Sequence, residues 1–171
     1  MMAFSRLFER CTHAMHVLSG VILVSMMFIT LADVVSRSMF EATDGSVDFT
    51  FIGGVELIKY GLLLMVLFAL PYSLGRSQVI VDLFTENLKA RSKAILEGFY
   101  ILGFMLLGGG MSYRFYHAVG QAQMSGETTQ DLLFPLYYIY GVTSFATAML
   151  AIAALLISLR LFFYWRGDKM L

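Results

Sequence analysis

The chain has 171 residues, of which 58% are hydrophobic and 14% charged, and its formal net charge is zero. Soluble domains average about 25% charged residues, so the composition favours a membrane protein. The neutral balance gives no reason to expect a nucleic-acid partner, and the single cysteine, Cys11, excludes an intramolecular disulfide.

The first apolar block predicts a membrane span over residues 14–36, because about 20 apolar residues cross a hydrocarbon core of roughly 30 Å. Arg6 and Arg10 precede it, as in a signal peptide. The block is too long for that role and lacks a small-residue cleavage site, so it is interpreted as a retained span. At its end, Asp33 and Arg37 have the spacing of an ion pair on one helix face.

A second span is predicted over residues 53–75. Glu56 and Lys59 stand three residues apart at its start, which again favours a local ion pair that sets a helix end or contacts a partner. After it, residues 79–92 have the pattern of a short amphipathic helix. Such a helix lies flat in the headgroups or against a partner, and the sequence leaves both open.

The third and fourth spans are predicted over residues 95–116 and 132–160. Both are rich in small residues, and small-residue faces let helices approach closely in lipid. Packing within the bundle would use some of these residues, and a surplus would serve a partner protein. The candidates for a partner interface are Gly103, Gly108, Gly109, Gly110, Thr143, Thr147, Ala151 and Ala154.

These elements predict an all-α integral membrane protein: a single domain of four transmembrane helices and a short amphipathic interfacial helix between spans two and three. Lys and Arg concentrate on the side of the two termini, whereas the other side holds Arg37, Lys59 and Arg114. The positive-inside rule therefore predicts cytoplasmic termini. The outward loops then carry Glu41, Asp44, Asp48, Glu127 and Asp131.

No catalytic, cofactor or metal site is predicted in this chain. Disulfide-generating quinone reductases need paired cysteines. Haem-binding anchors need histidines that face each other at one depth, but His13 and His16 stand at the opposite end from His117. A proton-coupled exporter needs an acidic residue inside a span, and the contenders, Asp33 and Glu56, each have a basic neighbour.

Three segments in order, 33–40, 53–57 and 75–83, resemble the small membrane (Q-type) subunit of tripartite ATP-independent periplasmic (TRAP) transporters. They hold Asp33 and Arg37, then Glu56, then Arg76, Gln78 and Asp82. The family usually has His where this chain has Gln78, so no proton-linked role is assigned there. The tryptophan that commonly precedes span two is also missing.

The resemblance implies a non-catalytic subunit that acts as a scaffold for a large, elevator-type membrane subunit in the bacterial inner membrane. A periplasmic substrate-binding protein would deliver a carboxylate-bearing solute, such as a sialic acid or a C4-dicarboxylate. Sodium would drive uptake from sites in the large subunit. The acidic outer loops are the candidate docking region for the delivery protein. The alternatives are an autonomous four-helix carrier or exporter, and a membrane anchor of an oxidoreductase.

Overall fold

The computed structural model describes residues 2–44, 52–74 and 90–167. This part of the chain folds into helices α1 (Met2–Ala42), α2 (Gly54–Ser73), α4 (Ala90–Ser125) and α5 (Leu136–Gly167), with no β-strand. Each helix contains a stretch long and apolar enough to cross a membrane. The predicted all-α membrane fold with four spans is therefore confirmed. Most of the predicted interfacial helix lies outside the described residues, and residues 90–92 belong to the start of α4.

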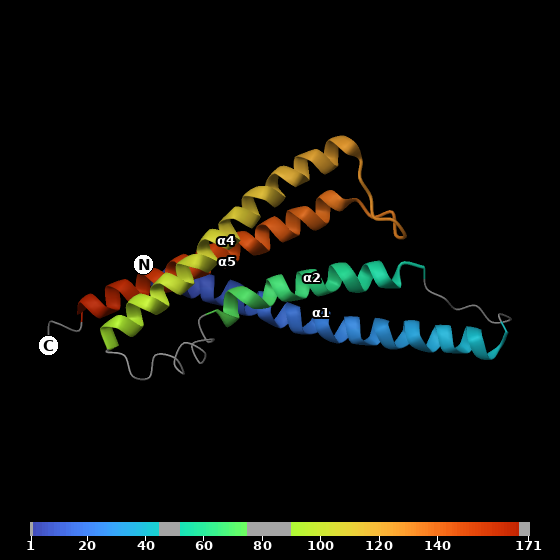
Figure 1. Cartoon of the computed structure of the whole chain (residues 1–171), viewed down its shortest axis with the longest axis horizontal. Helices are drawn as coiled ribbons and strands as arrows, with labels where there is room; N and C mark the ends of the chain where they lie inside the picture. The colour runs from blue at the N-terminus through green and yellow to red at the C-terminus, as the bar shows by residue number, and fades with distance from the viewer. Residues whose placement is uncertain (1, 45–51, 75–89, 168–171) are drawn as a thin grey trace.

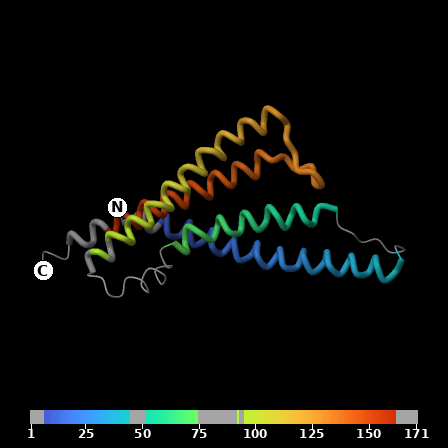
Figure 2. The backbone as a smooth tube through the Cα atoms, in the orientation of Figure 1, coloured from blue at the N-terminus to red at the C-terminus, as the bar shows by residue number. Residues whose placement is uncertain are grey.

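The four helices form two hairpins, α1 with α2 and α4 with α5 (Figure 1). The hairpins meet at the end where both chain termini lie, and they diverge toward the opposite end, as the backbone trace shows (Figure 2). Helices α2 and α5 provide the main contact between the hairpins. Both termini therefore lie on the same side of the membrane.

Three helices are longer than the spans predicted for them. Helix α1 has 41 residues, and at 1.5 Å per residue it is about 60 Å long, twice the hydrocarbon thickness. Helix α4 continues to Ser125 because good helix formers such as Gln121 and Ala122 follow its apolar part. It ends at Gly126, whose left-handed backbone (φ 67°) lets its N–H bond to the carbonyl of Ala122 at 3.1 Å.

Helix α5 lies at the centre of the packing. It contributes to one apolar cluster with α1 and α2, formed by Met15, Leu67, Phe68, Ala146 and Met149. It also contributes to a second cluster with α2 and α4, formed by Leu74, Ile101, Leu150 and Ala154. Helix α5 thus joins the two hairpins.

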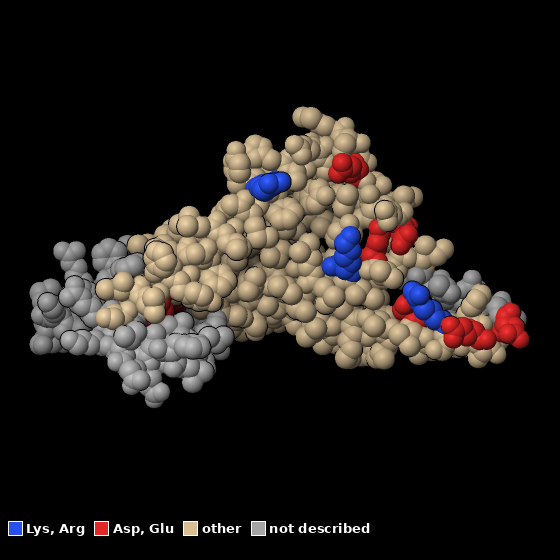
Figure 3. Space-filling model, viewed as in Figure 1, with Lys and Arg blue, Asp and Glu red and all other residues tan. Residues whose placement is uncertain are grey.

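Among the described residues, most of the charged side chains visible in Figure 3 lie toward the end where the hairpins diverge. In the same view, the surface of the middle of the molecule is almost free of Lys, Arg, Asp and Glu, and large apolar side chains such as Phe28, Phe99 and Leu106 are exposed in the described helices. An uncharged belt with exposed apolar side chains is the surface expected of a protein whose solvent is lipid.

Candidate functional site

The loop between α4 and α5 is held against the start of α2. The two carboxylate oxygens of Glu56 accept hydrogen bonds from the backbone N–H groups of Gln130, at 2.6 Å, and Leu132, at 3.1 Å. Leu132 also covers Gly53, where an added Cβ would lie 2.7 Å from the leucine Cδ2. Gly53 has a φ of 97°, so glycine fits both the left-handed backbone conformation and the limited space at this position. These contacts connect the two hairpins at their diverging end.

The same loop has a defined internal structure. The N–H of Thr129 donates to the carbonyl of Phe134 at 2.9 Å, and the N–H of Phe134 donates back to the Thr129 hydroxyl at 3.1 Å. An isolated β-bridge joins Thr128 and Pro135. Glu127 and Asp131 are exposed on this folded loop, which makes their carboxylates available to a soluble partner.

Of the two expected ion pairs, the structure brings one together. Arg37 Nε lies 3.0 Å from Asp33 Oδ2. Glu56 does not face Lys59 in the described structure: its carboxylate holds the loop, and the Lys59 ammonium lies 5.3 Å from the centroid of the Tyr60 ring. Backbone N–H groups compete successfully with the lysine because they approach both carboxylate oxygens, while the lysine side chain is exposed to solvent.

Half of the predicted interface positions pack inside the chain. Thr143, Thr147 and Ala154 are completely buried in the bundle. A Cβ on Gly108 would lie 3.0 Å from the carbonyl oxygen of Thr147 and 3.1 Å from the backbone nitrogen of Ala151. Gly108 is therefore the point at which α4 lies directly on the backbone of α5. These four positions serve helix packing within this subunit, which is the alternative that the sequence had left open.

The remaining glycines are open to the outside of the chain. Nothing lies within 4 Å of a Cβ built on Gly103, Gly109 or Gly110. Gly109 and the half-buried Ala151 line a groove of about 410 Å³ between α4 and α5. Its other lining residues are Ser112, Tyr113, Tyr116, Ser144, Ala148 and Ile152. The small-residue surface that is accessible to a partner is therefore this groove.

Two serines join the helices beside the groove. The Ser112 hydroxyl donates to the carbonyl of Ser144 at 3.0 Å, and the Ser144 hydroxyl donates to the carbonyl of Ser112, also at 3.0 Å. Interhelical hydrogen bonds of this kind stabilise helix association in lipid. Helices α4 and α5 thus form a hydrogen-bonded pair that presents the groove on one side.

The comparisons with known proteins identify the family. The family model of the DctQ component of tripartite ATP-independent periplasmic transporters matches residues 26–163. The chain belongs to the DctQ family. The match extends from the middle of α1 to the last turns of α5, so it includes Glu56, the α4–α5 loop and the groove. No curated protein and no solved structure matches the chain.

Several predicted positions of this DctQ component lie outside the described residues: Asp48, Arg76, Gln78 and Asp82. Among those described, Glu41 and Asp44 are exposed at the end of α1. No group of three His, Cys, Asp or Glu side chains in the described part could hold a metal ion. His13 and His16 both contact the Tyr72 ring, at 5.3 and 4.8 Å between centroids, while His117 contacts Tyr113 on α4.

Sequence reasoning missed two features of this DctQ component: the hydrogen bonds from the α4–α5 loop to Glu56, and the reciprocal pair of Ser112 and Ser144. A signal for the serine pair was present, because Ser112 follows Gly108 by four residues and so lies on the same helix face. No comparable signal connects Glu56 with a loop far along the chain. That contact depends on how the two hairpins are placed.

Proposed function

We propose that this small TRAP subunit is a non-catalytic scaffold for the large membrane subunit of the transporter. The transporter would import a carboxylate-bearing solute of the sialic acid or C4-dicarboxylate class across the bacterial inner membrane, driven by sodium that binds the large subunit. A periplasmic substrate-binding protein would deliver the solute. With both termini cytoplasmic, the α4–α5 loop faces the periplasm.

The observation that carries this proposal is the groove lined by Gly109 and Ala151 on the hydrogen-bonded pair of helices α4 and α5. Glycine has no side chain and alanine has only a methyl group, so the helix backbones are accessible and a helix of another protein can approach closely there. The pair itself is fixed by Gly108 and by the two serines. Two helices that are fixed to each other and present an open groove of small residues can serve as a static surface on which the moving large subunit is mounted.

Exposed carboxylates support the role proposed for the outer loops. Glu127 and Asp131 lie on the folded α4–α5 loop, and Glu41 and Asp44 lie at the end of α1. Charges at an exposed rim steer the encounter with a soluble protein more than they set its affinity. Their expected role is therefore to accelerate docking of the periplasmic substrate-binding protein.

Co-purification tests the interface. A leucine side chain at Gly109 would extend into the groove, because nothing lies within 4 Å of a Cβ at this position. We expect Gly109→Leu and Ala151→Leu to reduce recovery of the large subunit, since bulk keeps the helix backbones apart. Gly110→Leu is the matched control, because Gly110 is equally open but does not line the groove. Wild-type recovery with both groove variants would disprove this interface.

Reconstitution tests the scaffold role separately. Liposomes that contain the isolated chain, a sodium gradient and candidate carboxylates should show no uptake above that of empty liposomes. Liposomes with the complete transporter provide the positive control. Substantial uptake by the isolated chain would favour an autonomous carrier instead.

A further inference from the structure

Helix α4 carries an exposed cation in its outer half, Arg114, for which the described residues supply no partner. No hydrogen bond or ion pair joins Arg114 to another residue in the part that the structure describes. In contrast, Arg37 and Arg160 lie 3.0 and 3.2 Å from the carboxylates of Asp33 and Glu9. Arg114 therefore offers a free guanidinium to a ligand outside this chain.

The position of Arg114 along α4 places it at the edge of the hydrocarbon. The uncharged run of this helix lies between Glu97 and Arg114, and at 1.5 Å per residue these two are about 26 Å apart along the axis. The hydrocarbon core is about 30 Å thick. With Glu97 near one boundary, Arg114 lies near the other, and its long side chain can reach the headgroups.

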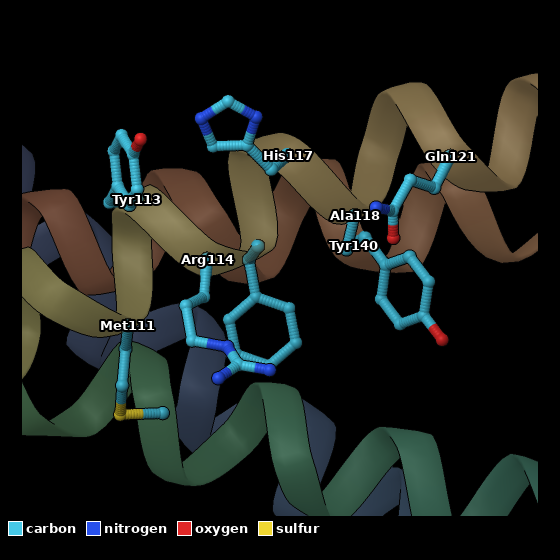
Figure 4. A pocket seen from close by; sticks show the side chains of 8 residues that line it. Met111, Tyr113, Arg114, His117, Ala118, Gln121 and Tyr140 are labelled. Atoms are coloured by element: carbon cyan, nitrogen blue, oxygen red, sulfur yellow. The ribbon is translucent and has the colours of Figure 1, made fainter.

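Arg114 lines a pocket of about 650 Å³ formed mainly by α4. Its guanidinium points from α4 toward α2, and the Gln121 amide points toward the Tyr140 ring (Figure 4). Tyr113 and His117 also line the pocket but project from the other side of α4. The rings of Phe115 and Tyr140, whose centroids are 5.9 Å apart, give it an apolar wall. The pocket thus combines hydrogen-bond donors with an apolar wall at the membrane boundary.

We propose that this pocket binds the phosphate of a membrane phospholipid. A guanidinium forms paired hydrogen bonds with phosphate oxygens, and a phosphate ester is the anion that membrane phospholipids present at this depth. The apolar wall accommodates the glycerol and upper acyl groups, which a free anion lacks. The side of the membrane on which this pocket lies depends on the topology proposed above, whereas the proposal of a phosphate site does not depend on it.

The test uses the purified full chain in a non-ionic detergent and short-chain dihexanoyl phosphatidylglycerol as the probe, with binding followed by phosphorus NMR. Arg114→Gln should weaken binding about tenfold or more, because hydrogen bonds to a charged group are lost. The affinity of Arg114→Lys should lie between those of the wild type and Arg114→Gln, because lysine keeps the positive charge but lacks the planar, two-donor geometry of the guanidinium. Arg160→Gln is the control, since Arg160 is also exposed but already paired with Glu9, and it should leave the affinity unchanged.

Four outcomes would overturn the proposal. Equal affinity of the wild type and the Arg114→Gln variant would show that the lipid binds elsewhere. Binding of inorganic phosphate as tightly as the lipid would show a general anion site without lipid recognition. If Arg114→Gln lowers recovery of the large subunit but leaves lipid binding unchanged, the guanidinium serves a carboxylate of the partner. Dihexanoylglycerol, which lacks phosphate, should not displace the phosphatidylglycerol probe in the phosphorus spectrum; efficient displacement would also exclude a phosphate site.

Discussion

The Glu56 carboxylate, in the first turn of α2, accepts a 2.6 Å hydrogen bond from the backbone N–H of Gln130 in the loop that precedes α5. A second oxygen of the same carboxylate accepts the N–H of Leu132. One side chain thus connects the two hairpins at the end where their backbones diverge (Figure 1). The loop that carries Glu127 and Asp131 is positioned by this contact.

Replacement of Glu56 should release the α4–α5 loop. Glu56→Ala removes both acceptors, and hydrogen bonds to a carboxylate are stronger than those between neutral groups. We expect amide hydrogen exchange of the 127–135 peptide to accelerate by about tenfold, because the loop loses both hydrogen bonds to α2 and opens more often. Glu41→Ala, at an exposed position on α1, is the control. Unchanged protection in Glu56→Ala would mean that Leu132 packing alone holds the loop.

Substitution by alanine should change stability differently at the adjacent glycines Gly108 and Gly109. Alanine at Gly108 would press on the backbone of α5 at 3.0 Å, whereas alanine at Gly109 meets open space. Overpacking of this kind costs about 1–3 kcal/mol. Gly108→Ala should therefore lower the thermal unfolding temperature of the detergent-purified chain, and Gly109→Ala should leave it unchanged or raise it slightly. Equal shifts would contradict the packing described here.

The reciprocal serine pair should contribute modestly to the contact between α4 and α5. Each interhelical hydrogen bond in a membrane is worth about 0.6 kcal/mol on average. Ser112→Ala and Ser144→Ala should each lower stability by about that amount in a denaturant titration. Their effects should be non-additive in the double variant, because the two hydroxyl oxygens are also in contact, 3.5 Å apart. Ser25→Ala is the control, since the Ser25 hydroxyl bonds to Val21 in its own helix. Strict additivity would show that the two serines act independently.

For Asp33 and Arg37, a single neutralisation should harm assembly more than removal of both charges. The Asp33 side chain is only 15% exposed, and its second oxygen, Oδ1, is shielded without a hydrogen-bond partner. Arg37→Gln leaves this carboxylate alone near the membrane, where an unpaired charge is costly, while the double variant with Asp33→Asn leaves none. Recovery of the transporter complex measures the effect. Equal losses in single and double variants would mean that the two residues act separately.

The proposed orientation predicts which positions react with a membrane-impermeant thiol reagent. In a Cys11→Ser background, cysteines at the exposed positions Glu41 and Gln123 should react in intact cells. A cysteine at Ser92, exposed at the other end of α4, should react only after permeabilisation. Labelling of Ser92→Cys alone in intact cells would reverse the topology.

The sequence by itself determined the four helices and the common side of the termini, because apolar length and the positions of charge follow from the chemistry of the bilayer. It also determined the spacing of Asp33 and Arg37, since helix geometry places residues four apart on one face. The predicted helix limits were less accurate. Helix α4 continues through polar residues to Ser125, and over these residues hydropathy no longer reports on secondary structure.

Only the tertiary structure decided which small residues pack inside the chain and which are open to its outside. Gly108 and Gly109 are neighbours in sequence, but the rotation of α4 about its axis places one on the backbone of α5 and the other in the open groove. The placement of the hairpins likewise brings the Glu56 carboxylate to two N–H groups of the α4–α5 loop, and Glu56 therefore does not pair with Lys59. It also leaves Arg114 without a partner among the described residues. These outcomes depend on contacts between residues far apart in sequence, which local spacing and hydropathy do not encode.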